Sequence, residues 1–454
     1  MAKSSNNAFL LLGLGGLLLA LNGVGLLLQK QGNVPWFVAT AIAQGIVYLL
    51  AVWMVCRTGP KRGVLVVILV FAGLLRVSIL FSQPILSDDI YRYVWDGRVQ
   101  ASGINPYRFI PADKELAPLR DQAIYPNINR REYARTIYPP LAQAIFFGAT
   151  RISESVLCMK AVIVAFEAAA VLMLIRLLVL LGLPAQRVLI YAWHPLAIWE
   201  FGGSGHIDAA AVALVVLALW MRKRDSPVLT GVALAGATLV KLFPVVLFPA
   251  LYRRGDWKMP AAFFASVFFG YLPYLGVGTV VMGFLPGYLQ EEGFQGGWGI
   301  FLPSLVERLR PSWHLDGTAY LLVASIVLLA VGLRFSFRRS DDGNGYIAAA
   351  ITLATIFLIF LSPHYPWYFL WVVPMLCFHP YIPTLYLTVI CFVLYEALLQ
   401  ATGPLLFRVN ILLYLPFALL AILGLLLRRT GNGTGRTASC EIGEENRIAA
   451  YISK

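Results

Sequence analysis

Apolar stretches of about twenty residues recur along the chain, separated by short polar loops. A helix needs about 20 apolar residues to cross the ~30 Å hydrocarbon core of a bilayer, so each stretch predicts a membrane-spanning helix. The expected spans lie near residues 8–29, 36–56, 63–84, 158–182, 188–203, 207–222, 259–277, 318–334, 346–361, 366–379, 383–400 and 409–427. The pattern predicts an all-α integral membrane protein with about twelve crossings, to within about two.

Two further apolar segments do not fit as simple crossings. They are "IYPPLAQAIFFGAT" at 137–150 and "VLTGVALAGATLVKLFPVVLFPAL" at 228–251, which contains Lys241 and a proline near its middle. If only one of them crossed, the basic loops that follow would face the opposite side of the membrane. We therefore expect both to be re-entrant or broken helices, which are tolerated where they are buried in protein or line a cavity.

Composition supports a membrane protein. Hydrophobic residues make up 59% of the chain and charged residues 13%, against about 45–50% and about 25% in soluble domains. The net charge is +13, but the basic residues fall in short clusters between spans, such as "MRKRD" at 221–225. Such clusters indicate which loops face the cytoplasm, and they argue against nucleic-acid binding. The five cysteines form no CxxC pair, so neither a metal cluster nor a disulfide framework is indicated.

The basic clusters also predict which side each loop faces, because short loops rich in Lys and Arg stay in the cytoplasm. Both termini and a polar tail at 430–454 are then cytoplasmic, and residues 1–429 form a single polytopic domain. The first apolar stretch is expected to be a retained helix rather than a signal peptide. Residues 85–137 and 278–317 form two outer loops, and the first should carry short amphipathic helices lying on the membrane surface.

The first outer loop begins with an adjacent acid pair, Asp88 and Asp89, in "SDDIYRYVWDGR". A charge in hydrocarbon costs roughly 3 kcal/mol, so the pair must lie in water or in a polar cavity. It could act as a general base, bind a divalent cation such as Mg²⁺ or Mn²⁺, or bind a cationic substrate; a hydrated helix end is the simpler interpretation. Tyr91, Arg92 and Trp95 follow, an alternation that suits a sugar, although aromatic belts are also common at membrane interfaces.

A second polar stretch on the outer face is "GGSGHID", in which His206 and Asp208 start a span. A helix N-terminus beside a histidine is a favourable phosphate site, and a plain helix cap is the alternative. Lys241 lies at membrane depth, where ionisable groups are costly and often functional. Its side chain could instead extend to the cytoplasmic side.

Two more polar stretches share the outer face, "GFQGGWG" and "SPHYPWYFLW". The second supplies His364, Tyr365, Trp367 and Tyr368. These residues suit a lipid headgroup, and an aromatic girdle is the alternative. Convergence of four such stretches on one face is the main indication of a functional site.

Four segments of the chain resemble a known family. They are "SDDIYRYVWDGRVQASGINPY", "IYPPLAQAIF", "HPLAIWEFGGSGHIDAAAVALVVLAL" and "GVALAGATLVKLFPVVLFPAL". Together they are similar to the GT-C glycosyltransferases that use polyprenyl-phosphate sugars, and most of all to glycosyltransferase family 87 and the polyprenol-phosphate-mannose-dependent α-mannosyltransferases. The resemblance covers residues 63–260 well and the C-terminal third only in general pattern. It implies a GT-C-like helix bundle with a large first outer loop.

The resemblance also implies a function. It suggests a hexosyltransferase of the bacterial cytoplasmic (inner) membrane that passes a sugar, above all mannose, from a polyprenyl phosphate to a lipid or glycan acceptor outside the cytoplasm. Asp88 occupies the place of the family's catalytic base, but the local spelling D-D differs from the frequent D-x-D or D-E. Which of Asp88 and Asp89 acts therefore stays open.

The resemblance implies that the protein binds the phosphate of its donor. The candidate residues for phosphate binding are His206, His364, Arg92 and Arg408. A transporter or flippase of a charged or glycosylated lipid is the alternative function, because Lys241 and the broken helices also suit such a protein. No inverted repeat is visible, however, and the polar residues gather at one face rather than at the midplane.

Overall fold

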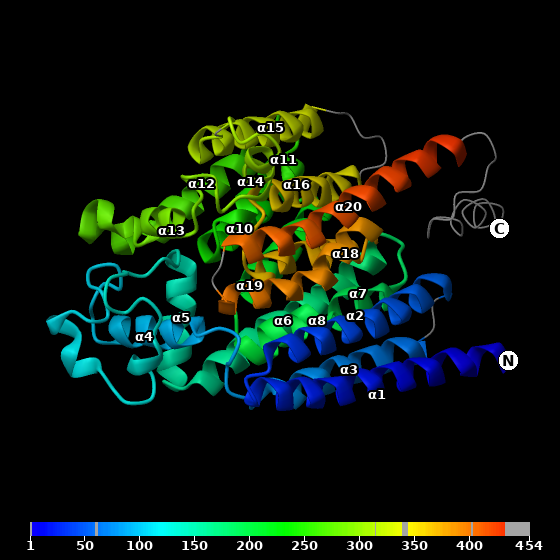
Figure 1. The fold of residues 1–454 in the computed structure, drawn as a ribbon, viewed down its shortest axis with the longest axis horizontal. Coiled ribbons are helices and arrows are strands. Elements are labelled where there is room, and N and C mark those ends of the chain that lie inside the picture. Colours follow the sequence, from blue (N-terminus) through cyan, green and yellow to red (C-terminus); the bar gives the residue numbers. More distant parts are fainter. Residues whose placement is uncertain (1, 60–61, 314, 338–343, 401–402, 432–454) are drawn as a thin grey trace.

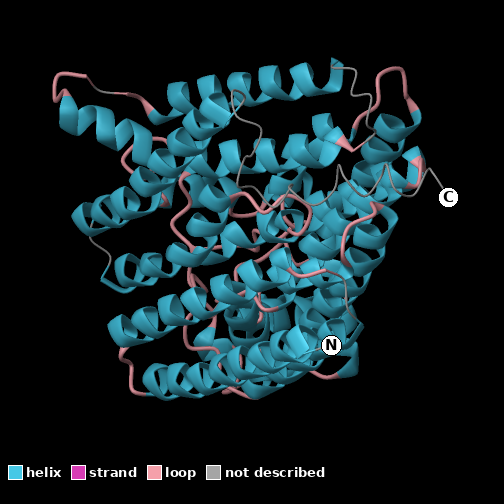
Figure 2. Cartoon of the chain, turned by 90° about the vertical axis from the view of Figure 1, so that its right-hand side faces the viewer, coloured by secondary structure: helices cyan, strands magenta, loops and turns pink. Residues whose placement is uncertain are grey.

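Long helices run side by side in the computed structural model, which describes residues 2–59, 62–313, 315–337, 344–400 and 403–431. These residues form helices and loops, with no strand among them (Figure 2). Seven helical segments of this described part are long and apolar enough to cross a membrane: Ala8–Lys30, Val34–Arg57, Gly63–Leu80, Val156–Leu180, Lys258–Glu291, Gly317–Phe337 and Pro404–Leu427. Four shorter apolar helices are Pro227–Val240, Gly345–Leu361, Pro366–Leu376 and Ile382–Leu398. The predicted all-α membrane fold is confirmed.

The N-terminal helices form one side of the bundle. They are α1 (Ala2–Lys30), α2 (Val34–Arg57) and α3 (Arg62–Leu80), and α1 packs against both others. The α2 helix starts where the Asn33 side chain accepts the backbone N–H of Trp36 at 3.4 Å. Large apolar side chains such as Leu27 and Ile46 remain exposed on this side. Helices that are apolar all round are typical of membrane spans, where lipid covers such side chains.

Four helices of the bundle pack against one another in a row. These are α6 (Val156–Leu180), α9 (Asp208–Lys223), α10 (Pro227–Val240) and α12 (Lys258–Tyr271), each packed against the next in that order. A Cβ atom at Gly231 would lie 2.3 Å from the carbonyl oxygen of Met259, so α10 and α12 touch through their backbones. Close approach of this kind is how membrane helices gain packing energy.

The α10 helix is broken, as the sequence predicted. Its fourteen residues rise only about 21 Å, which is less than a bilayer core. Lys241 leaves the helix in an extended conformation, and η5 (Phe243–Leu247) and α11 (Phe248–Leu251) continue the chain. Pro244 lacks the N–H needed to extend α10, which explains the interruption.

The segment at 188–203 is not the continuous crossing expected from its apolar pattern. It consists of η3 (Ala185–Val188), α7 (Leu189–Ala192), α8 (Pro195–Ala197) and η4 (Ile198–Ser204). Pro195 disfavours helical backbone at the residue before it, and Gly205 ends η4 with a φ of +77°. Residues 186–212 are all buried, so this irregular backbone is shielded from lipid, as it must be.

The C-terminal half adds a second group of helices. These are α15 (Gly317–Phe337), α16 (Gly345–Leu361), η7 (Pro366–Val372), α17 (Val373–Leu376), α18 (Ile382–Ile390), η8 (Cys391–Val393), α19 (Leu394–Gln400) and α20 (Gly403–Gly431). The α15 helix packs on α16, and α18 packs on α20. The polar tail expected at 430–454 lies almost entirely outside the described residues.

Both expected outer loops lie at one end of the bundle, opposite the N-terminus (Figure 1). The first contains α4 (Asp89–Ala101), η1 (Lys114–Leu119) and η2 (Tyr125–Asn127) and leads into α5 (Pro140–Ile152). The second contains η6 (Leu272–Met282), α13 (Leu285–Glu291) and α14 (Phe301–Leu309). The α4 helix packs against α5 and α6 and is buried along most of its length. This differs from the expected amphipathic helix on the membrane surface.

Candidate active site

The acid pair stands at the start of α4. Asp88 occupies the N-cap position and Asp89 is the first helical residue. The Ser87 hydroxyl accepts the backbone N–H of Asp89 at 3.3 Å, which helps to begin the helix. Negative charge is favourable at a helix N-terminus because unpaired N–H groups point outward there. Asp88 is exposed and Asp89 is partly buried, so the pair spans from solvent into the protein.

The two carboxylates share one hydrogen-bond donor. The Asn129 amide nitrogen lies 2.9 Å from Asp88 Oδ1 and 2.8 Å from Asp89 Oδ1. Partial burial and the neighbouring Asp89 raise the pKa of Asp88 above its ordinary value, while Asn129 and Arg130 act in the opposite direction. A carboxylate with a raised pKa is a stronger base at neutral pH.

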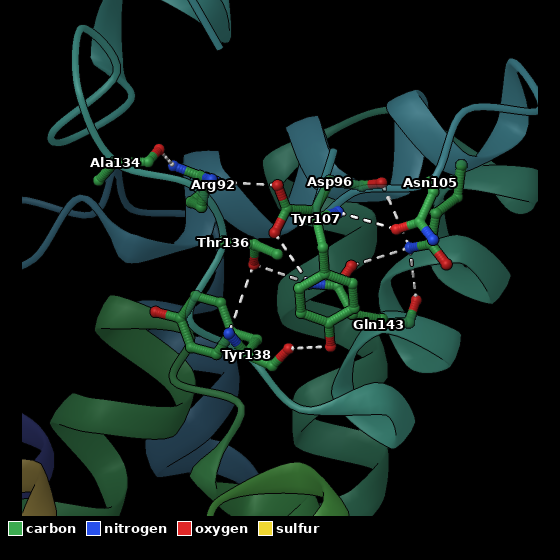
Figure 3. A network of polar contacts seen from close by, with 9 residues as sticks. Arg92, Asp96, Asn105, Tyr107, Ala134, Thr136, Tyr138 and Gln143 are labelled. Carbon is green, nitrogen blue, oxygen red and sulfur yellow. Dashed lines mark hydrogen bonds and ion pairs between the residues drawn. The ribbon is translucent and has the colours of Figure 1, made fainter. Parts of the chain in front are cut away.

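A buried polar network fixes α4 against the chain beneath it (Figure 3). Arg92 Nε binds Asp96 Oδ1 at 2.8 Å, and a second guanidinium nitrogen donates to the carbonyl of Ala134 at 3.2 Å. The Gln143 amide donates to Asp96 Oδ2 at 3.0 Å and to the Thr136 hydroxyl at 2.8 Å. The network therefore ties the helix that carries the acid pair to residues 134–143.

The same network continues to the neighbouring helical segment. The Tyr107 hydroxyl donates to the carbonyl of Tyr138 at 2.7 Å, and the Asn105 amide donates to the carbonyl of Tyr274 at 3.1 Å. Tyr93 stacks on Phe146 with ring centroids 4.5 Å apart. These contacts leave α4 little freedom to move, which is what a site that must align reacting groups requires.

The acid pair lines a cavity of about 340 Å³. Five segments supply nearly all of its wall: residues 86–92, 129–139, 241–243, 284–294 and 361–368. The cavity thus combines parts of both outer loops, the break after α10 and the stretch before η7. Much of the lining is apolar or aromatic, with a few charged side chains, which is the usual character of a small-molecule site.

Lys241 faces this cavity. Its amino group lies 3.1 Å from Asp208 Oδ2 and 5.0 Å from the ring centroid of Tyr368. Asp208 at the start of α9 thus holds the Lys241 side chain toward the cavity that the acid pair also lines. A lysine paired with a single buried carboxylate retains N–H donors that a ligand could use.

His206 lies behind the cavity wall rather than in it. The residue is fully buried, and its ring packs on Trp367 with centroids 4.1 Å apart. Neither ring nitrogen has a hydrogen-bond partner among the described residues, and Nε2 lies 3.6 Å from Glu200 Oε2. His206 therefore supports a cavity residue and does not itself reach the cavity.

The outer wall is organised around Glu292. Its carboxylate accepts the Tyr365 hydroxyl at 2.5 Å and lies 2.7 Å from His364 Nδ1. The other His364 nitrogen lies 2.6 Å from the carbonyl oxygen of Gly299. Because both ring nitrogens face acceptors, His364 holds residues 292–299 in place and is not free to bind a phosphate in this arrangement. Arg130 pairs with Glu291 at 2.7 Å and joins this wall to the acid pair's loop.

The backbones of the two loops expected to lie outside also touch. Phe284 donates its N–H to the carbonyl of Thr136 at 3.2 Å. Gly283 adopts a φ of +59°, and a Cβ atom there would lie 1.8 Å from the Thr136 oxygen. Only glycine fits this contact, because other residues would clash and rarely adopt a positive φ.

The structure brings some of the predicted site residues together and separates others. Those that line the cavity are Asp88, Asp89, Arg92, Lys241, His364, Tyr365, Trp367 and Tyr368. Those that do not line it are Tyr91, Trp95, His206, Asp208 and Arg408. The Arg92 guanidinium already forms an ion pair with Asp96. Trp95 is buried against Tyr125, with ring centroids 5.5 Å apart, and Arg408 is exposed on α20.

Several cavity residues were missed by the sequence analysis, namely Asn129, Arg130, Tyr138, Tyr288 and Glu292. Glu292 stands in "EEGFQGGWG", just before the stretch singled out there, and the polar run "NINRRE" contains Asn129 and Arg130. Only polar composition could have drawn attention to them, since their partners lie far away along the chain.

A divalent cation does not fit the acid pair as it is arranged. Within the described residues, no three or more His, Cys, Asp or Glu side chains are grouped so that they could hold a metal ion. Asn129 presents N–H donors to the carboxylates, whereas Mg²⁺ and Mn²⁺ need oxygen ligands. The residues around the acid pair therefore give no support to a metal-assisted step.

Comparison with known families identifies the chain. A model of the MptA_B family, described as the N-terminal domain of alpha-(1->6)-mannopyranosyltransferases, matches residues 12–253. This match covers more than half of the chain. The chain belongs to this family. It is therefore a membrane glycosyltransferase that acts on mannose, a GT-C hexosyltransferase as the resemblance predicted. No match was found among curated proteins or solved structures.

The family match covers only part of the site. Asp88, Asp89, Asn129 and Lys241 fall inside the matched residues. The segments at 284–294 and 361–368, which complete the cavity, fall outside them. The candidate site is thus assembled from both halves of the chain.

Proposed function

We propose that the protein transfers mannose from a polyprenyl-phosphate donor to a hydroxyl of a lipid or glycan acceptor at the outer face of the bacterial cytoplasmic membrane. The observation that carries this proposal is a single cavity lined by both the acid pair and Lys241. Such a cavity offers a base for the acceptor and a cation for the leaving phosphate. Surrounding lipids would hold the isoprenoid tail.

The chemistry is a single displacement at the sugar's anomeric carbon. Asp88 takes the proton from the acceptor hydroxyl as its oxygen attacks that carbon, and the bond from the carbon to the phosphate oxygen breaks. The electron pair leaves with the phosphate, and the proton passes from exposed Asp88 to water. Such a displacement inverts the configuration, so an α-mannoside product requires a β-linked donor.

The donor's phosphate would bind Lys241. Charge-assisted hydrogen bonds between an ammonium and a phosphate are shorter and stronger than neutral ones. Asp208 keeps the amino group in place, and Leu242 and Phe243 next to it contribute apolar surface to the same cavity. An apolar surface beside the phosphate site suits the first isoprene units of the donor.

Replacement of Lys241 by Met should reduce kcat/KM for the lipid donor by about 10- to 100-fold, the loss expected for hydrogen bonds to a charged group. Initial rates with radiolabelled polyprenyl-phosphate-mannose in detergent would measure this. Lys258→Met is the matched control, because Lys258 is exposed at the start of α12. Full recovery in Lys241→Met/Asp208→Asn would show that the loss came from an unpaired Asp208, and would remove Lys241 from the donor site.

The proposed outer location of the site predicts a labelling pattern. Single cysteines replacing exposed Glu115 and Trp298 should react with an impermeant thiol reagent in sealed cells, and one replacing exposed Arg224 should not. The background variant has its five native cysteines replaced by alanine. Gly299 is unsuitable as a labelling position, because a Cβ atom there would lie 1.8 Å from the Glu292 carbonyl oxygen. Labelling at Arg224→Cys alone would reverse the orientation and favour a cytoplasmic nucleotide-sugar donor.

A further inference from the structure

We propose that Asn129 is a positioning residue of this mannosyltransferase, one that keeps Asp88 and Asp89 aligned for proton transfer. The inference rests on the proposed function, in which Asp88 is the base. Its geometric basis is the pair of hydrogen bonds from one amide nitrogen to Oδ1 of each carboxylate, at 2.9 and 2.8 Å. A side-chain amide has two N–H donors, and the acid pair occupies both donors of Asn129.

A shared donor matters because adjacent carboxylates repel each other. Two such groups in one site usually differ in pKa, since the first ionisation makes the second harder. The Asn129 amide offsets this repulsion without adding a charge of its own. It also fixes one oxygen of each carboxylate, which leaves the second oxygen of Asp88 available to the acceptor hydroxyl.

The loop holds Asn129 in a defined place. Ile128 before it is buried, and Arg130 after it adopts a φ of +50°. The carbonyl of Arg130 accepts backbone N–H groups from Tyr133 at 3.2 Å and Ala134 at 2.9 Å. Positive φ is uncommon outside glycine, and where the surrounding structure enforces it, it often marks a functional site. The turn at Arg130 thus presents the Asn129 amide to the acid pair.

Other groups also interact electrostatically with the pair. Arg130 and Tyr91 interact with Asp88, and Lys241, His206, Tyr93 and Tyr138 interact with Asp89. Arg130 forms an ion pair with Glu291, and Lys241 forms one with Asp208. The Asn129 amide contacts both carboxylates directly, so its removal should change the titration of Asp88 while these charges stay in place.

The test is the pH dependence of kcat for mannose transfer. Loss of the amide raises the pKa of the base, so Asn129→Ala should move the acid limb of the profile upward by about one pH unit. At a pH below the new limb, kcat should fall about tenfold, with KM for both substrates within about twofold. Asn127→Ala is the matched control, since Asn127 is exposed and its amide contacts only the Ala123 carbonyl among the bonds resolved for it.

A second variant guards against misfolding. Asn129→Asp has the same shape but replaces both donors with a third carboxylate, so its acid limb should move further than that of Asn129→Ala. An unchanged acid limb in both variants would overturn the inference.

Asp88→Asn separates this inference from the proposed function. If Asp88→Asn stays active while the acid limbs of the Asn129 variants shift, the base is misassigned and Asn129 positions another carboxylate. If Asp88→Asn is inactive and the acid limbs of the Asn129 variants do not shift, Asp88 remains the proposed base and Asn129 is not its positioning residue.

Discussion

Asp88→Asn should lower kcat for mannose transfer by about 10²- to 10⁴-fold, the usual contribution of a positioned general base. The substitution keeps the size and shape of the side chain and removes its basicity. Because Asp88 is exposed, the folded protein should melt at nearly the same temperature as the parent. Steady-state rates with radiolabelled donor, together with a thermal melt in detergent, would measure both effects.

The matched control for this experiment is Glu115→Gln, which neutralises an exposed acid in the same outer loop at a site that does not line the cavity. It should leave kcat unchanged. The parent's kcat should also fall as pH drops through the raised pKa of Asp88, because protonation removes the base. Full turnover by Asp88→Asn would exclude Asp88 as the base and make Asp89 the next candidate.

Asp96→Asn should be the most destabilising single change in the acid pair's supporting network. Asp96 is 2% exposed and pairs with Arg92, which is 4% exposed. Removing one member of a buried ion pair leaves the other charge without compensation and costs about 3–5 kcal/mol. Thermal or denaturant unfolding of the purified protein would report the change in the free energy of unfolding.

Two variants show whether that loss comes from the uncompensated charge. Glu154→Gln breaks the ion pair that Arg98 of α4 makes with Glu154, an acid that is 41% exposed, and should cost less than about 1 kcal/mol. Arg92→Met/Asp96→Leu removes both charges and should recover much of the stability lost by Asp96→Asn. A loss from Asp96→Asn no larger than that from Glu154→Gln would contradict the proposed role of the network.

The apolar pattern was sufficient to predict the helices that face lipid, because their sequences satisfy one simple requirement of length and hydrophobicity. It failed at 188–203, where a buried segment is as apolar as a span but Pro195 and Gly205 interrupt the helix. It also misjudged α4, whose polar residues pair with one another inside the protein. The spacing of Arg92 and Asp96 by one helical turn permitted that pairing, but their burial depends on α5.

The candidate site was predictable to the extent that its chemistry is local in the sequence. Adjacent Asp88 and Asp89 and the intramembrane Lys241 are unusual in themselves, so they were found. Asn129 and Glu292 are ordinary polar residues whose importance lies in partners 40 and 72 residues away. Trp95 shows the converse error, since its aromatic character suggested a sugar platform and its ring is instead buried beside Tyr125.

The cavity wall is divided between the two halves of the chain. The groups proposed to react lie in the first half, and the segments that would select the acceptor lie in the second. The proposed base, its neighbouring acid and the lysine precede residue 253, where the family match ends, and the wall at 284–294 and 361–368 follows it. Substitutions in the later segments can reshape the space available to the acceptor without altering any group that transfers a proton or meets the phosphate. Under the proposed function, enzymes built on this plan can share one reaction and differ in the acceptor that the later segments admit.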